Sequence, residues 1–161
     1  MQSNGKLLAA AAAVLVIAAT SSGHAETLRS NVAFNTSIGQ MTADQPANGH
    51  QVSFQITLKG GDLDGCTVDV VESLYGREDG AWGIFDIAGD LKCERGGFSY
   101  TSSGAWDGNG FHAAGTIEEG SGSGDFEGVS GRVASLSGGA KPTEGGGADI
   151  SYEIVFDTNE S

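Results

Sequence analysis

The stretch CTVDVVESLYGREDGAWGIFDIAGDLKC, residues 66–93, contains the pattern that decides the fold. Apolar and polar residues alternate on both sides of Asp79-Gly80, a pair well suited to a two-residue type I′ hairpin turn. With the turn centred on this pair, Leu74 lies opposite Phe85, and both belong to the apolar face of their strands. The stretch therefore predicts an antiparallel hairpin with one apolar and one polar face.

The same register places Cys66 opposite Cys93, and these are the two cysteines of the chain. Directly opposed residues of antiparallel strands lie roughly 4.5 to 5.5 Å apart at Cα, which is within the range of a disulfide. We therefore predict a Cys66–Cys93 disulfide. The alternatives are two buried thiols or one catalytic thiol. A metal pair is disfavoured because no further Cys or His lies nearby in sequence to complete the site.

Short alternating segments, separated by Gly, Asp and Asn, continue through the chain without helical periodicity after the N-terminal stretch. The predicted strands are 28–38, 51–59, 66–75, 83–93, 97–104, 111–118, 132–137 and 148–156. Without helices to cover them, their apolar faces must meet each other in a sandwich or inside a closed barrel. Eight antiparallel strands suffice for a barrel that holds side chains or one small ligand. The fold class predicted is a single all-β, eight-stranded antiparallel barrel.

The N-terminal residues 1–25 have the order of a secretory signal, with one lysine, an apolar run over residues 7–19 and small residues up to Ala25. A membrane anchor is the alternative, but the apolar run is shorter than the roughly 20 residues that span a bilayer. We expect cleavage after Ala25, which leaves residues 26–161 as one secreted or periplasmic domain.

The chain is acidic, with 21 Asp and Glu residues against 8 Lys and Arg and a net charge of −13. Such a surface repels nucleic acid and anionic lipid. We therefore expect no nucleic-acid partner and, after signal cleavage, no membrane association. Solubility outside the cell explains the acidity better than an acidic interaction tail does.

Glycine is unusually frequent between residues 118 and 139. The spacing does not match a phosphate-binding loop, no helix follows, and Asp125 and Glu127 would repel phosphate. A calcium loop is a second interpretation, but the glycine-aspartate repeat occurs once, whereas such sites are built from stacked copies. The interpretation that we favour is a structured connection. Its glycines adopt positive φ while Phe126 and Val129 anchor it to the barrel.

The run GSGDFEGVSG, residues 122–131, resembles the GTGxFxGAxG segment of the allene oxide cyclase and dirigent barrel group. The stretch GGFSYTSSGAWDGNGFHAAGTIEEGSGSGDFEGVSG is most similar to small bacterial proteins of that group, classed as a domain of unknown function. The resemblance covers roughly residues 60–156. It implies an eight-stranded barrel with a lumen, no cofactor and, as in several relatives, a homo-oligomer. The signal sequence and the cysteine pair depart from the usual cytosolic type of the bacterial family.

The apolar faces of the strands predict the residues of the lumen, and Glu72 is a lone carboxylate among them. A carboxylate in an apolar cavity has a raised pKa and can act as a proton donor or base, so Glu72 and Tyr100 are the catalytic candidates. The alternative, which we favour here, places Glu72 at the barrel rim, where the strand meets water. The ligand-binding candidates are the inward aromatic residues Phe54, Phe85, Phe98, Phe111, Tyr152 and Phe156.

Other residues that often carry chemistry give no site. His112 shares a face with polar residues outside the barrel, and His50 lies in a polar loop, so we expect no metal ligands. Trp82 and Trp106 flank hairpin turns, where they pack at the rim or line a ligand mouth. No G-x-S-x-G elbow is present in the sequence.

Three functions fit these patterns. The leading hypothesis is a secreted or periplasmic barrel that binds a small apolar molecule in its lumen without changing it. The second is a cofactor-free cyclase or isomerase like the enzymes of the resembled group, in which confinement orients a reactive substrate. The third is a non-catalytic scaffold whose partner binds outside.

Overall fold

The computed structural model describes residues 25–35, 42–44, 50–76, 82–144 and 148–159. Nearly all of this chain is strand. The elements are β1 (Ala25–Asn35), β2 (Thr42–Asp44), β3 (His50–Thr57), the 3-10 turn η1 (Gly61–Leu63), β4 (Thr67–Gly76), β5 (Trp82–Cys93), β6 (Gly96–Asp107), β7 (Gly110–Ile117), β8 (Ser123–Gly124), β9 (Ser130–Pro142) and β10 (Ala148–Asn159).

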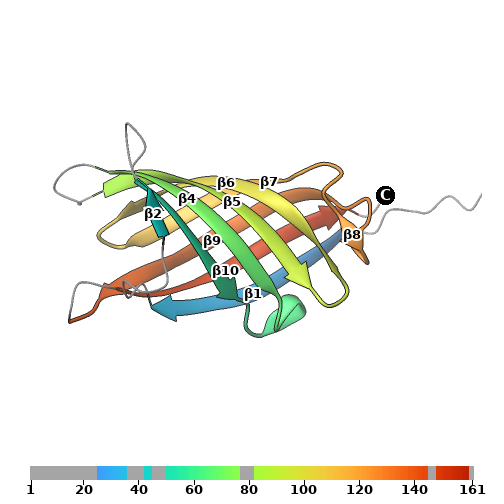
Figure 1. The fold of residues 1–161 in the computed structure, drawn as a ribbon, viewed down its shortest axis with the longest axis horizontal. Coiled ribbons are helices and arrows are strands. Elements are labelled where there is room, and N and C mark those ends of the chain that lie inside the picture. Colours follow the sequence, from blue (N-terminus) through green and yellow to red (C-terminus); the bar gives the residue numbers. More distant parts are fainter. Residues whose placement is uncertain (1–24, 36–41, 45–49, 77–81, 145–147, 160–161) are drawn as a thin grey trace, which may run out of the picture.

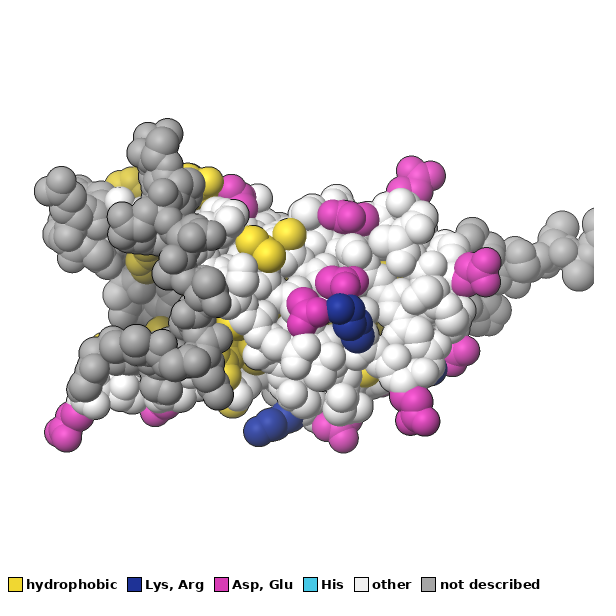
Figure 2. Space-filling model, viewed as in Figure 1, with side chains coloured by type: hydrophobic (Ala, Val, Ile, Leu, Met, Phe, Trp, Pro, Cys, Tyr) yellow, Lys and Arg dark blue, Asp and Glu magenta, His cyan; other side chains and the backbone are white. Residues whose placement is uncertain are grey.

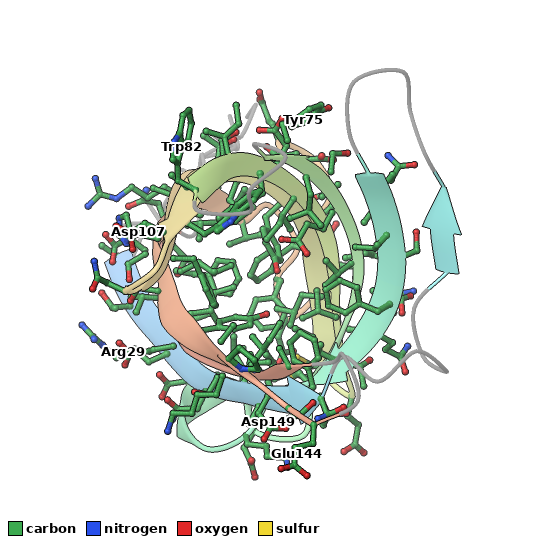
Figure 3. The ribbon with its side chains drawn as sticks, turned by 90° about the vertical axis from the view of Figure 1, so that its left-hand side faces the viewer. Arg29, Tyr75, Trp82, Asp107, Glu144 and Asp149 are labelled. Atoms are coloured by element: carbon green, nitrogen blue, oxygen red, sulfur yellow. A yellow bond between two sulfur atoms is a disulfide. The ribbon has the colours of Figure 1, made fainter. Side chains whose placement is uncertain are left out.

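The strands form one antiparallel sheet in the order β1-β10-β9-β7-β6-β5-β4-β3-β2, with β8 paired to β6. The sheet curls into a barrel (Figure 1), and the view along its axis shows β2 outside the ring next to β3 (Figure 3). Each of the eight predicted strands corresponds to one long strand, so the predicted barrel is confirmed. The short strands β2 and β8 and the turn η1 were not predicted.

The two sides of the sheet meet through one backbone bridge between Asn31 on β1 and Lys59, just after β3. The Asn31 N–H donates to the Lys59 carbonyl at 3.1 Å, and the Lys59 N–H donates to the Asn31 carbonyl at 2.8 Å. This bridge closes the barrel beside η1, at the end away from β2.

The register of the hairpin formed by β4 and β5 agrees with the prediction. Leu74 pairs with Phe85, and Cys66 and Cys93 form a disulfide with a Cα–Cα distance of 4.5 Å. The predicted turn at Asp79-Gly80 lies outside the described residues, but the pairing on its two sides has the register that such a turn imposes.

The outer face of the barrel is polar, and acidic side chains are spread over the face seen in Figure 2. Lys92 on β5 lies between two of them, with Nζ 2.6 Å from Asp69 and 3.1 Å from Asp90. All three side chains are about half exposed, so these pairs contribute little to stability. The inward face therefore supplies most of the favourable free energy of folding.

The end of the barrel that holds the disulfide is filled by packed side chains. The ring of Phe98 contacts Phe126 and Phe156 edge-to-face, at centroid distances of 5.3 and 5.1 Å. The ring of Phe156 in turn contacts Tyr100 at 5.1 Å. These four rings form an aromatic column that runs from the glycine-rich connection to the middle of the barrel.

The glycine-rich connection between β7 and β9 is a fixed part of this closed end. Gly120, Gly124 and Gly128 have φ of 74°, 62° and 76°, in the left-handed region that favours glycine. Phe126 and Val129 are buried at 7% and 3% exposure. The favoured interpretation of this stretch as a structured connection is therefore confirmed.

The predicted signal sequence covers residues 1–25, of which residues 1–24 lie outside the described residues, and Ala25 is the first residue of β1. Cleavage after Ala25 thus stays a prediction. Within the described ranges, no helix is long and apolar enough to cross a bilayer.

Candidate functional site

The other end of the barrel contains a cavity of about 700 Å³, with a wall built from all eight long strands. Figure 3 looks into this end, where side chains converge inside the ring of strands while Trp82 and Arg29 point away from it. The volume lies in the range of pockets that hold small organic ligands. The aromatic side chains therefore leave part of the lumen open, and a ligand inside the barrel requires such a space.

A continuous row of aromatic rings forms one wall of this cavity. Phe85 lies 6.4 Å from Trp106 and 6.2 Å from Phe111, and Phe111 lies 5.7 Å from Tyr152, measured between ring centroids. The Phe85–Phe111 and Phe111–Tyr152 contacts are edge-to-face, an arrangement that aromatic quadrupoles favour. Each ring thus limits the rotation of its neighbour, and the wall is preorganised.

Glycines on the neighbouring strand make room for two of the lumen rings. Tyr100 is paired with Gly89, and Trp106 is paired with Gly83. A Cβ added at Gly89 would overlap the tyrosine ring, and one added at Gly83 would overlap the indole. Both rings therefore lie flat across the adjacent strand, which fixes the direction of each side chain.

The same arrangement recurs on the other side of the barrel. Tyr152 on β10 is paired with Gly138 on β9, and a Cβ at Gly138 would meet the tyrosine Cβ. Gly138 is also the partner of Phe111 on β7. One glycine thus accommodates two aromatic neighbours, which brings Phe111 and Tyr152 into contact.

Glu72 on β4 lines the cavity, with Val52 and Ile87 as its neighbours across the sheet. Burial raises the pKa of its carboxyl from the ordinary 4.5 to about 7. No hydrogen bond or ion pair to this carboxyl is found within the described ranges. Glu72 is only partly exposed, so the alternative that placed it in water at the rim does not describe its surroundings.

Two tyrosine hydroxyls share the cavity with Glu72. Burial raises the pKa of Tyr100, and burial together with the nearby Tyr100 and Glu72 raises the pKa of Tyr152. Both phenols therefore stay protonated at every physiological pH and can donate a hydrogen bond. The cavity thus combines an apolar body with one carboxyl and two phenols, and of these three groups Glu72 alone changes charge near neutrality.

The structure separates the predicted site residues into two groups. Glu72, Tyr100, Phe54, Phe85, Phe111 and Tyr152 all line the cavity. Phe98 and Phe156 do not, because they belong to the aromatic column and are about 1% and 0% exposed. Cys66 and Cys93 form the disulfide at the closed end, away from the cavity.

Two aromatic residues of the cavity were not assigned to the lumen from the sequence. Phe34 on β1 and Trp106 on β6 both line it. The signal was present in each case: Phe34 follows Leu28 and Val32 in the alternation of β1, and Trp106 continues the parity of Tyr100. Trp106 lies beyond the predicted strand 97–104, whereas β6 extends to Asp107.

A smaller hollow of about 300 Å³ lies beside the glycine-rich connection and is mostly polar. There the Arg95 guanidinium covers the ring of Phe126 at 4.8 Å.

The structure describes the side chain of one of the two histidines considered in the sequence analysis. His112 is exposed on the outer face, and the His50 side chain lies outside the described residues. In the described ranges, no group of three or more His, Cys, Asp or Glu side chains is arranged to hold a metal ion.

No family model matches this chain, and no curated protein matches it. The function is therefore argued from the geometry of the cavity.

Proposed function

We propose that this protein binds a small, mostly apolar molecule in the cavity and holds it without changing it. The observation that carries the proposal is the cavity itself. Its aromatic wall is preorganised, and its polar side chains include the Glu72 carboxyl and the hydroxyls of Tyr100 and Tyr152. Because water in an apolar cavity is easily displaced by apolar surface, binding there is favourable.

The proposal also includes the compartment of the protein and the family to which its barrel is related. The predicted signal sequence supports a secreted or periplasmic protein, and the acidic composition suits that environment. The eight-stranded barrel is compatible with the allene oxide cyclase and dirigent group that residues 122–131 resemble. A native mass spectrum of the protein secreted by its own host reports three things: a mature chain that begins at Glu26, the oligomeric state and any bound molecule.

Two variants make this experiment specific for the cavity. Leu74 lines the cavity, so Leu74→Trp adds an indole to its interior. Ile84 lies on the same hairpin but is 53% exposed, so Ile84→Trp adds the same group outside. We expect a releasable small-molecule mass on the wild type and on Ile84→Trp, and none on Leu74→Trp. An empty wild-type protein would favour the scaffold, whose partner binds outside.

A second candidate is a cofactor-free cyclase or isomerase. The observation in its favour is the pKa of Glu72 near 7, which suits a group that both accepts and donates a proton. The captured molecule, once identified, separates the two functions by incubation with fresh protein. A binding protein returns it unchanged, whereas an isomerase converts it to a product of equal mass and different chromatographic retention, and Glu72→Gln abolishes that conversion.

A further inference from the structure

The polar groups of the cavity also indicate what kind of molecule it holds. Glu72 lies on β4, between the aromatic residues of β3 and β5. On one side, Phe54 of β3 packs against Phe34 with ring centroids 5.2 Å apart. On the other side, Phe85 of β5 begins the row of rings that ends at Tyr152. Val52 and Ile87 are the direct partners of Glu72, and Phe54 and Phe85 occupy diagonal positions on the same two strands, so carboxyl and rings line one cavity.

We propose that the ligand is a cation, an apolar molecule with an ammonium group that pairs with the Glu72 carboxylate between the aromatic walls. This inference rests on the ligand-binding role proposed above. An ammonium group is attracted both to a carboxylate and to the faces of aromatic rings. A carboxylate in this setting lacks a counterion, and the ligand supplies one.

The charges around the cavity agree with a cationic ligand. The titratable or charged side chains that line it with Glu72 are Tyr100, Tyr152, Asp107 and Lys141. The two tyrosines are neutral, and Asp107 on β6 and Lys141 on β9 carry opposite formal charges, so an ionised Glu72 leaves the lining with a net negative charge. The net charge of −13 on the whole chain attracts cations and repels anions at long range.

The protonation of Glu72 determines how the affinity for a cationic ligand should change with pH. Burial raises the pKa of Glu72 to about 7, so the carboxyl is largely protonated at pH 5 and ionised at pH 8. A cation binds the ionised form, and its affinity falls about tenfold for each pH unit below 7. A neutral ligand whose carbonyl group accepts a hydrogen bond from protonated Glu72 gives the opposite dependence.

The test uses three probes with the same ten-carbon chain: decyltrimethylammonium, 1-decanol and decanoate. The quaternary ammonium keeps its charge at every pH, so the titration of the protein alone is observed. Calorimetry at pH 8 and pH 5 measures the affinity of the wild type, Glu72→Gln and Glu118→Gln. Glu118 is exposed on the outer face, so its variant controls for the loss of one negative charge.

We expect the ammonium probe to bind wild type at pH 8 at least about tenfold more tightly than decanol, and decanoate to bind most weakly. The preference should disappear in Glu72→Gln and at pH 5, and persist in Glu118→Gln. Equal affinity for all three probes in both proteins would overturn the cation while leaving lumen binding intact. Tighter binding of decanol at pH 5 than of the ammonium probe at pH 8 would also overturn it, in favour of a neutral acceptor.

If the cavity does not bind ligands at all, the result is distinguishable from these outcomes, because none of the three probes would then bind at either pH. If Glu72→Gln did not fold, as judged by circular dichroism, the pH dependence of the wild type would decide. An affinity for the ammonium probe that did not change between pH 5 and pH 8 would exclude a pairing with Glu72.

Discussion

The rings of Phe34 on β1 and Phe54 on β3 lie 5.2 Å apart, and they close the side of the barrel that the backbone leaves open. In this half of the barrel β3 uses its free edge to pair with β2, through Thr42 to Asp44. The Asn31–Lys59 bridge joins β1 and β3 near the other end. Among the described residues, side-chain packing therefore replaces backbone hydrogen bonds along this part of the seam.

Phe34→Ala should loosen that seam while the rest of the barrel stays folded. Removing a partly buried ring leaves a gap that the neighbouring strands fill poorly, and the loss is about 3 kcal/mol or less. Hydrogen exchange measured by mass spectrometry should show faster exchange in β1 and β3, with β6 and β7 unchanged. Val71→Ala removes an exposed side chain on β4 and serves as the control. Uniform acceleration in all strands would mean that the seam is not a separate unit.

Glu72 should make the fold less stable as the pH rises. Its carboxyl is neutral in both states below its unfolded pKa of 4.5, and it is ionised in both states well above its folded pKa of about 7. Between these values the unfolded chain loses the proton first. The free energy of unfolding therefore falls by roughly 3 kcal/mol across this window.

The measurement compares wild type with Glu72→Gln in urea at pH 4.5 and pH 8. Glu72→Gln lacks the titrating group, so its stability relative to wild type should rise by roughly 3 kcal/mol over the window. Asp69 and Asp157 have lowered pKa values because they bond Lys92 and Arg132. They act only at lower pH, where stability is lost as they protonate. A constant difference between the two proteins would show that Glu72 is not desolvated.

Gly89→Ala should destabilise the protein by displacing the ring of Tyr100. The added Cβ overlaps the ring, and overpacking of this kind costs about 1 to 3 kcal/mol. Gly139→Ala is the matched control, because a Cβ at this strand glycine meets nothing within 4 Å. The double variant Gly89→Ala/Tyr100→Ala should show strong coupling in a double-mutant cycle. Additive effects would mean that the two residues do not share the space.

Loss of the disulfide should destabilise the fold without changing the cavity. Cys66 and Cys93 are 27 residues apart in sequence, and closing a loop of that length is worth about 3 to 4 kcal/mol in the chain-entropy model. Urea unfolding of Cys66→Ser/Cys93→Ser against wild type measures the difference. Binding of the decyl probes should be unchanged, because the bridge lies at the closed end. An alkylating reagent should add no label to denatured, unreduced wild type.

The sequence predicts those features that depend on residues close together in the chain, and it does not predict those that depend on tertiary contacts. One hairpin turn determines the pairing of β4 with β5, so the disulfide and the inward position of Glu72 were predictable from alternation. Which end of the barrel is open depends on where the Phe126 ring packs, and that is a tertiary contact. Phe98 and Phe156 therefore shared the lumen pattern of Phe85, although they belong to the packed column.

The pairing of aromatic residues with glycines on neighbouring strands also could not be predicted from the sequence. It requires the register between β5 and β6 and the register of β9 with β10 and with β7, and a bulge interrupts simple alternation in each of the two β9 pairings. A bulge shifts the inward parity of every residue beyond it. Tyr152 and Gly138 were each visible in the sequence, but their juxtaposition was not.

The aromatic column and the disulfide hold one end of the barrel, while the cavity occupies the other. Over evolutionary time the two ends should drift at different rates. Substitutions around Phe34, Leu74 and Trp106 reshape the cavity, whereas changes at Phe98 or Gly124 disturb the packed end. Descendants of this chain should therefore keep the glycine-rich end and diversify at the opening.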